Sequence, residues 1–291
     1  MPQPPRVQLF ITCIVDSLFP QVGEAVIDVL KRLGVDVEFP EAQTCCGQPA
    51  YNAGFRDEAR EAALHFMNVF SSPPSVPPLL TASFDFAQDA RSGEGGWGGE
   101  AVPYILTPSG SCAAMIVHGY RDLFAGDPAN LARARAVAAR TYEFSQFLVE
   151  VLKVEDVRAS LGSASRSTPL GQDRRFGGPL TYHPSCHLLR GLGVKDAPTK
   201  LLSHVREAEI VPLPNAEECC GFGGLFAIKH GDISSAILDR KLENIRATKA
   251  ATVVGCDMSC LMHIQGALSR DGSRTRCVHL AEVLASTDKS G

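Results

Sequence analysis

The chain has 291 residues, of which 45% are hydrophobic and 21% charged, with a formal net charge of −4. This length exceeds most single cores and suits two domains of a globular protein. The charge balance offers no basic surface for nucleic acid, and no apolar run reaches the roughly 18 residues of a spanning helix. The opening residues lack the features of a secretory signal, so we expect a cytoplasmic protein without a membrane span of its own.

The first half alternates predicted strands and helices and carries cysteines after its strands. Ser71–Glu100 interrupts this order with prolines at Pro73–Pro78 and glycines at Gly93–Gly99, a composition typical of a flexible surface insertion. The elements expected are a strand at Val7–Thr12 before Cys13, an amphipathic helix over 22–33, a strand at Val35–Phe39 before Cys45-Cys46-Gly47, a helix at Asp57–Phe70, and a strand at Tyr104–Thr107 before Cys112.

The second half repeats this order, which indicates an internal duplication. Cys13 and Cys45 are 32 positions apart, and Cys186 and Cys219 are 33 apart. The expected elements are a strand at Leu180–His183 before Cys186, a helix from Asp196, a strand at Glu209–Leu213 before Cys219-Cys220-Gly221, a helix at Ile233–Ala250, and a strand at Ala251–Gly255 before Cys256 and Cys260.

Alternating strands and helices predict an α/β fold, because parallel strands need helical crossovers. We therefore expect two tandem homologous α/β domains with parallel sheets. The first covers residues 1–157 with the insertion at 71–100, a linker covers 158–178, and the second covers 179–291. In such sheets ligands bind at the carboxyl ends of strands, so the cysteines of each copy are expected to meet at one rim.

Ten cysteines in a reducing compartment favour metal binding or redox chemistry over disulfides. Adjacent cysteines are too constrained to pair with each other but can both face one polynuclear centre. Four thiolates suit either structural zinc or an iron–sulfur cluster. Zinc sites usually draw on CxxC pairs, which are missing here, whereas Gly47 and Gly221-Phe-Gly-Gly224 leave room for a cluster and supply backbone N–H groups.

Five motifs resemble those of the cysteine-rich CCG-domain proteins, a family that includes the CCG-containing component of heterodisulfide reductase and the iron–sulfur component of glycolate oxidase. The resemblance covers nearly the whole chain. The motifs are Cys45-Cys46-Gly-Gln-Pro-Ala-Tyr-Asn-Ala-Gly54, Pro108-Ser-Gly-Ser-Cys112, His183-Pro-Ser-Cys186-His187, Glu218-Cys-Cys-Gly-Phe-Gly-Gly224 and Ser259-Cys-Leu-Met-His263.

The resemblance implies one iron–sulfur cluster per domain, taken as [4Fe–4S], with four cysteine ligands each. Reductase-type members end in CxxC, but Ser109 and Asp257 stand at the first position of that motif here, which leaves the cluster geometry open. Cys256 is a candidate additional ligand, and Cys277 is expected in the core. The implied ligands are Cys13, Cys45, Cys46 and Cys112 in the first domain and Cys186, Cys219, Cys220 and Cys260 in the second.

Three histidines flank the implied ligands, namely His183, His187 and His263. Each is a candidate donor to cluster sulfur or a carrier of protons, with an ordinary structural role as the alternative.

Within the family, the motifs are most similar to those of lactate-utilization proteins. This implies an iron–sulfur electron-transfer subunit that works with two companion subunits, one of them ferredoxin-like, in the oxidation of L-lactate to pyruvate. Alternatives are a heterodisulfide or thiol-disulfide reductase, a subunit of a glycolate oxidase, and a zinc-stabilised scaffold. No catalytic residue is assigned.

Overall fold

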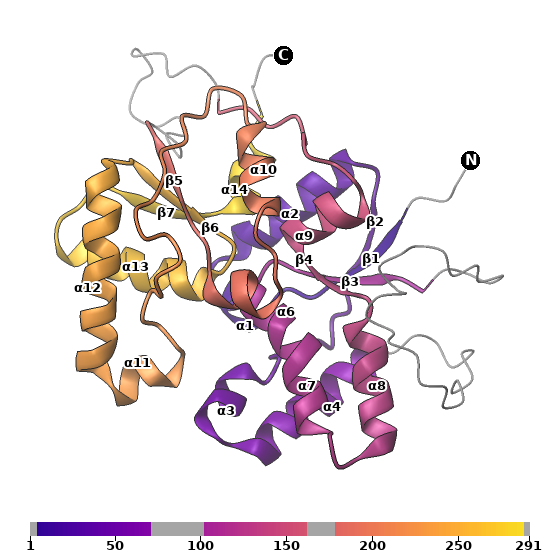
Figure 1. Cartoon of the computed structure of the whole chain (residues 1–291). Helices are drawn as coiled ribbons and strands as arrows, with labels where there is room; N and C mark the ends of the chain where they lie inside the picture. Colours follow the sequence, from indigo (N-terminus) through magenta and orange to yellow (C-terminus); the bar gives the residue numbers. More distant parts are fainter. Residues whose placement is uncertain (1–4, 71–101, 162–177, 288–291) are drawn as a thin grey trace.

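The computed structural model describes residues 5–70, 102–161 and 178–287. The predicted insertion at 71–100 and most of the predicted linker lie outside these ranges. Within them the chain forms two lobes, one from each half of the sequence (Figure 1). In the described residues no helix is long and apolar enough to cross a membrane.

The first half forms a four-stranded parallel sheet in the order β2-β1-β3-β4. Val7 in β1 is in register with Val37 in β2 and Tyr104 in β3, and Ile105 in β3 is in register with Thr141 in β4. The strands are β1 (Arg6–Leu9), β2 (Asp36–Glu38), β3 (Tyr104–Thr107) and β4 (Thr141–Glu143).

Helices connect these strands, and two short π-helical turns extend the helices that follow β3 and β4. The elements are α1 (Cys13–Leu18), α2 (Pro20–Arg32), α3 (Gln48–Ala53), α4 (Arg56–Val69), α6 (Gly110–Ala114), η1 (Met115–Gly119), α7 (Tyr120–Leu123), α8 (Pro128–Ala138), α9 (Phe144–Gln146) and η2 (Phe147–Val151).

The second half forms a three-stranded parallel sheet in the order β5-β6-β7. Its elements are β5 (Leu180–His183), η3 (His187–Gly191), α10 (Ala197–Ser203), α11 (Leu225–Lys229), α12 (Gly231–Thr248), β6 (Thr252–Gly255), α13 (Met258–Arg270), β7 (Arg276–His279) and α14 (Leu280–Ala285). Together with the first sheet, this confirms the predicted α/β class and duplication.

The strand predicted at Glu209–Leu213 is reduced to a single parallel bridge between Leu180 and Ile210. Pro212 and Pro214 lack the N–H groups that a longer ladder would need, so pairing stops there. The bridge still occupies the edge that β2 occupies in the first sheet, and the strand order of the two halves therefore corresponds.

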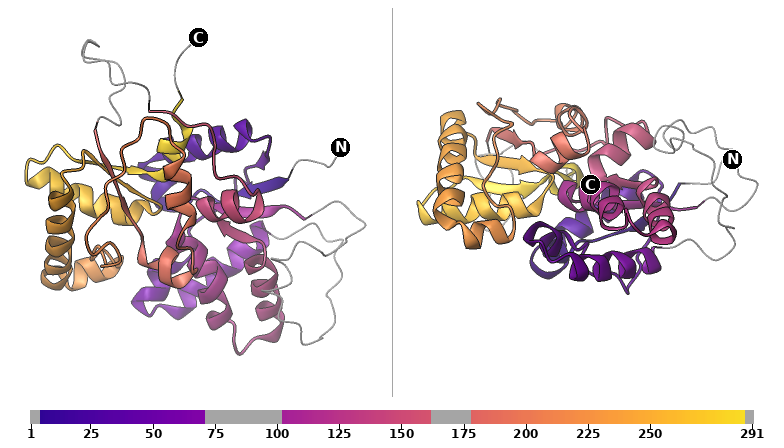
Figure 2. Two further views of the ribbon diagram at one scale, coloured as in Figure 1. Left: turned by 45° about the horizontal axis from the view of Figure 1, so that its top comes forward. Right: turned by 60° about the horizontal axis from the view of Figure 1, so that its bottom comes forward.

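The two halves contact each other through equivalent elements, in the manner of a two-fold dimer. Helix α2 of the first half packs on α14 of the second, and α10 packs on α9 in return. Helix α6 packs on η3, α1 on α13, and α3 on α11. Figure 2 shows the two halves side by side from two further directions. The elements that follow the cysteines thus meet along the boundary between the halves.

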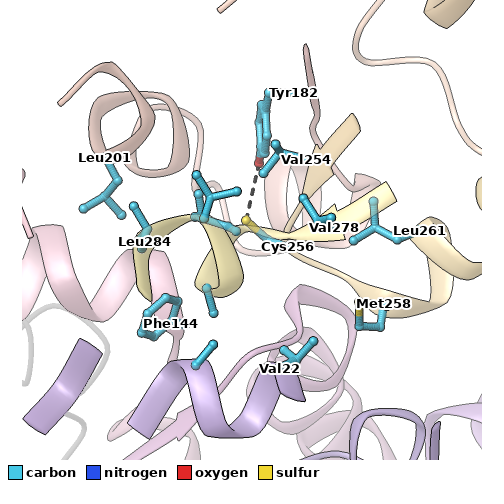
Figure 3. Close-up of a cluster of buried hydrophobic side chains, with 14 of the residues drawn as sticks. Val22, Phe144, Tyr182, Leu201, Val254, Cys256, Met258, Leu261, Val278 and Leu284 are labelled. Atoms are coloured by element: carbon cyan, nitrogen blue, oxygen red, sulfur yellow. Dashed lines mark hydrogen bonds between the residues drawn. The ribbon is translucent and has the colours of Figure 1, made fainter. Parts of the chain in front are cut away.

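One hydrophobic core runs across this boundary. Figure 3 shows Val22 and Phe144 of the first half beside Leu201, Val254 and Leu284 of the second. A second, smaller core lies in the first half only and is built on Phe10, whose ring meets Phe66 edge-to-face at 5.0 Å. The halves therefore share burial rather than stand as separate bodies.

The first residues of the predicted linker pack against the second half. Ser160 is buried and forms a parallel bridge to Arg206, and its N–H donates to Ser286 O at 3.1 Å. Arg32 of α2 reinforces this boundary from the other side, with its guanidinium donating to Val157 O, Leu284 O and Ala285 O at 3.1, 3.0 and 2.7 Å. The last two are carbonyls at the end of α14, which a helix leaves without internal partners.

Candidate metal centres

Four cysteines of the first half converge at the carboxyl ends of its strands. Cys13 begins α1 a short turn after β1, the Cys45-Cys46 pair follows β2, and Cys112 lies in α6 after β3. The Sγ atoms of Cys13 and Cys45 are 3.8 Å apart, and those of Cys46 and Cys112 are 3.3 Å apart. Cys45 and Cys46 also contact each other, so the four sulfurs form one continuous group.

The second half repeats this arrangement with Cys186, Cys219, Cys220 and Cys260. Sulfur contacts join Cys186 to Cys219, Cys219 to Cys220, and Cys220 to Cys260. In both halves the last two cysteines are buried and the first two are more accessible, with Cys13 exposed. We call the two groups the first and the second cysteine set.

A glycine with a positive φ completes each set. Gly47 has φ of 82° and Gly221 has φ of 87°, values that favour glycine. The turn directs the Gly47 N–H to Cys45 Sγ at 3.4 Å and the Gly221 N–H to Cys219 Sγ at 3.3 Å. Each CCG motif thus supplies two sulfurs and a backbone donor that stabilises a thiolate.

The sulfurs of a set resist being charged together. Hydrogen bonds from Cys13 and Cys46 lower the pKa of Cys45 to about 3, and hydrogen bonds from Cys186 and Cys220 lower the pKa of Cys219. The same contacts raise the pKa of the neighbouring thiols. Cys45 and Cys219 are therefore the thiols that lose a proton most readily in their sets, and binding of a cation favours the thiolate form of its ligands.

The donor sets suit a metal ion or an iron–sulfur cluster. For a tetrahedral zinc site with Zn–S of about 2.3 Å, ligand sulfurs are about 3.8 Å apart, close to the contacts seen, whereas a polynuclear cluster would spread them further. The observed spacing thus fits a single ion without rearrangement, and a cluster would require the cysteine side chains to move apart. The presence of two adjacent cysteines in one turn, with N–H groups directed at sulfur, favours the cluster.

The residues that replace the first cysteine of a CxxC motif have a structural role. Ser109 is the N-cap of α6, with its Oγ accepting from Cys112 N at 3.2 Å, and Asp257 is the N-cap of α13. The Asp257 carboxylate also accepts from Ser111 N at 2.8 Å across the boundary between the halves. These positions therefore fix the helices that carry Cys112 and Cys260.

Cys256 contacts Tyr182 rather than a cysteine of the second set in the hydrogen bonds of the described residues. Figure 3 shows it among buried apolar side chains, and its Sγ is 3.8 Å from the hydroxyl of Tyr182. Burial, followed by the nearby charge of Glu143, raises its pKa well above the usual value. This placement disfavours Cys256 as an additional ligand. Cys277 packs against the shared core, as expected for a structural cysteine.

All three flanking histidines belong to the second half. Cys186 Sγ is 3.7 Å from His187 Nδ1, and His263 Nε2 is 3.4 Å from the hydroxyl of Ser234. His183 is fully buried, and its ligand atom lies within 4.8 Å of those of Cys220 and Cys260. Neither of its nitrogens has a hydrogen-bond partner among the residues that the structure describes. Burial lowers its pKa to about 3, so the imidazole is neutral.

Two further buried groups were not singled out from the sequence. Lys241 is fully buried, and its Nζ donates to Asn215 O at 3.3 Å and Ala216 O at 2.9 Å in the loop before Cys219. Glu143 is fully buried as well, and burial raises its pKa to about 7. The signal for Lys241 was present, because it stands on the apolar face that Leu238, Leu242 and Ile245 define.

An open cavity of about 320 Å³ borders the first set. Its walls include Cys13 and Cys45, the ring of Phe39, and two acidic residues, Asp16 and Glu41. Carboxylates beside thiolates make this space unfavourable for an anion.

Comparison with known proteins connects both sets to one kind of domain. The cysteine-rich domain designated CCG matches residues 7–81 and again 180–265. Lactate utilization protein A of Geobacillus kaustophilus is 45% identical over 279 residues, which cover 96% of this chain and 98% of that protein. The proteins of the same name from Geobacillus thermodenitrificans and Anoxybacillus flavithermus are 44% and 45% identical over the same length and the same shares of both chains.

Proposed function

The chain belongs to the family of cysteine-rich CCG-domain proteins, and from that premise we propose that it is an iron–sulfur electron-transfer subunit of a system that oxidises L-lactate to pyruvate. The observation that carries the proposal is the pair of equivalent four-cysteine sets in one chain. A bound cluster supplies one-electron chemistry, and two such centres in one subunit can pass electrons singly. The lactate assignment is supported by the names of its relatives.

In this proposal Cys13, Cys45, Cys46 and Cys112 hold the first centre, and Cys186, Cys219, Cys220 and Cys260 hold the second, each as [4Fe–4S]. The protein's own contribution is to hold eight thiolates and to direct N–H groups at sulfur. Gly47 and Gly221 supply those donors. Hydrogen bonds of this kind set the potential of a cluster.

The hydroxy acid is oxidised in a companion subunit rather than beside the first centre. The cavity there carries Asp16 and Glu41 next to the sulfurs, and their charges repel the carboxylate of lactate. Two companion subunits, one of them a ferredoxin-like iron–sulfur protein, complete the electron path in this proposal, which places the protein in the cytoplasm.

A test begins with the iron and acid-labile sulfide of the anaerobically purified protein, together with its electron paramagnetic resonance spectrum. Cys46→Ala and Cys220→Ala are each expected to remove one centre and about half of the iron, while Cys277→Ala keeps all of it. Zinc without sulfide, or loss of all iron in one single variant, contradicts the proposal of two clusters.

The lactate assignment needs a separate experiment in cells. A strain that lacks this chain should fail to grow on L-lactate and regain growth with the wild-type chain but not with the double variant of Cys46 and Cys220. Undiminished growth of the deletion strain on L-lactate would refute the assignment, and a defect confined to glycolate would favour the glycolate-oxidising alternative.

A reductase acting on disulfides is the second candidate, favoured by the open cavity beside the exposed Cys13. Against it, Ser109 and Asp257 act as helix caps where the additional cysteines of reductase-type members would stand. Turnover of a disulfide by the purified protein with an artificial electron donor would establish it.

A further inference from the structure

The two cysteine sets are equivalent in their sulfurs but not in the side chains behind them. Three residues before Cys186 stands His183, and three residues before Cys13 stands Phe10. Both are fully or almost fully buried at the end of, or just after, the first strand of their half. The same position is therefore apolar in the first half and an imidazole in the second.

A second position differs in the same way. The carbonyl of Ala59 in α4 approaches Gly47, and the carbonyl of Ser234 in α12 approaches Gly221. Ala59 and Ser234 are therefore equivalent positions of the two helices. Seven residues on from these carbonyls stand Phe66 in the first half and Lys241 in the second. Both side chains are buried, at 3% and 0% exposure.

In each half the two residues act as a pair. Phe10 and Phe66 lie in edge-to-face contact, in a hydrophobic cluster that also contains Cys46 and Cys112. His183 and Lys241 interact electrostatically, and Lys241 also interacts with the charges of Cys219, Cys220 and Cys260. An aromatic pair behind the first set thus corresponds to an imidazole and an ammonium group behind the second.

His183 needs a hydrogen-bond partner that the described part of the chain does not supply. Among the described residues, the buried side-chain atoms without a hydrogen bond are the two nitrogens of His183, Thr107 Oγ1 and Glu143 Oε1. Leaving a buried donor unpaired costs about 1–3 kcal/mol. A neutral imidazole has one N–H to donate. One of its nitrogens lies within 4.8 Å of the sulfurs of Cys220 and Cys260, without a hydrogen bond to either thiol but beside the space that a centre held by them would occupy.

We propose that His183 donates a hydrogen bond from its imidazole to sulfur of the second iron–sulfur centre, with the Lys241 ammonium as a fixed positive charge behind it. The pair raises the reduction potential of this centre above the value that the same four cysteines would give against an aromatic pair. This inference rests on the proposed function, because it requires a cluster in the second set.

The physical reason is the charge that reduction adds. A reduced cluster carries one more negative charge than an oxidised one, and an N–H donor and a buried cation stabilise that charge at low dielectric. Phe10 and Phe66 offer neither. Lys241 keeps its place because the carbonyls of Asn215 and Ala216 hold its Nζ.

The experiment is a redox titration of the anaerobic full-length protein, followed by electron paramagnetic resonance. His183→Phe, which installs the side chain of the first half, should lower the ratio of reduced to oxidised second centre about tenfold at a fixed potential, or about 59 mV for one electron. Lys241→Met should shift the same centre in the same direction, and Cys220→Ala identifies which signal belongs to it.

His183→Asn keeps an N–H donor, so it should shift the second centre less than His183→Phe, and it serves if the phenylalanine variant fails to fold. Phe10→Leu is the matched control and should leave the second centre unmoved. Unchanged potentials in a fully loaded His183→Phe protein would overturn the proposal. Loss of one centre in both His183 variants would make His183 a ligand instead. A wild-type protein without iron refutes the proposed function itself.

Discussion

Replacing Gly221 by alanine would place a methyl group 2.5 Å from the backbone oxygen of Ser234. Ser234 lies in α12, so its carbonyl cannot rotate away without breaking the helix. Gly221 also has φ of 87°, which costs an alanine about 1–2 kcal/mol. Overpacking adds about 1–3 kcal/mol, so we expect the free energy of unfolding to fall by about 2–5 kcal/mol in total.

Two other glycines separate the backbone cost from the steric cost. Gly54 has φ of 85° with nothing within 4 Å of an added methyl, so Gly54→Ala bears the backbone cost alone. At Gly47 the methyl would lie 3.1 Å from Ala62 Cβ and 3.2 Å from Ala59 O, a tight contact that small movements relieve. The expected order of increasing destabilisation is Gly54→Ala, Gly47→Ala and Gly221→Ala.

The assay is the melting temperature and the iron content per chain of the three anaerobic variants. In proteins of about 150–250 residues each kcal/mol lowers the melting temperature by about 2–4 °C, and we expect a slightly smaller shift in this longer chain. Gly221→Ala should also lose iron from the second centre, because the Gly221 N–H donates to Cys219 Sγ. If Gly221→Ala melted with Gly54→Ala and kept its iron, the close approach of α12 would not constrain this turn.

Three more variants test polar groups that are buried or partly buried. Burial raises the pKa of Glu143 from 4.5 to about 7, so the free energy of unfolding falls by about 3 kcal/mol as pH rises through that interval. Glu143→Gln should therefore flatten the fall in melting temperature between pH 5 and pH 8. An unchanged fall would contradict this. Arg32→Met removes the hydrogen bonds to the end of α14 and should cost about 2–3 kcal/mol without loss of iron, measured by melting temperature and iron analysis. Asp257→Ala removes the cap of α13 and the acceptor of Ser111 N and should cost about 1–2 kcal/mol by the same assay, whereas alanine at the exposed Asp239 should cost little.

The duplication and the parallel sheets could be predicted from the spacing of the cysteines and from the alternation of strand and helix patterns along the chain. The intervals from Cys13 to Cys45 and from Cys186 to Cys219 differ by one residue. Parallel strands then bring the cysteines of each copy together at the carboxyl ends of one sheet. The strand at Glu209–Leu213 was overestimated, since its apolar residues outweighed the prolines that limit it to one bridge. Strand propensity summed over a segment does not register that a proline lacks the N–H group needed for a longer ladder.

The contacts across the boundary could not be predicted from either copy alone. Asp257 reaches Ser111 N only because the halves face each other about a two-fold relation, which no local pattern encodes. The burial of Lys241 could have been predicted from its place on the apolar face of α12, but its partners could not. Its acceptors, Asn215 O and Ala216 O, lie in a loop whose path becomes fixed only in the folded chain.

The pairing of the halves across a shared core also bears on how such a protein could arise. A dimer of two identical chains must carry the same residue at both equivalent positions, so a change behind one centre is copied behind the other. In a single chain the two positions can differ, and here Phe10 and Phe66 stand in the first half where His183 and Lys241 stand in the second. A duplicated single chain can thus keep the paired geometry of a two-fold dimer while its two cysteine sets differ in the side chains behind them.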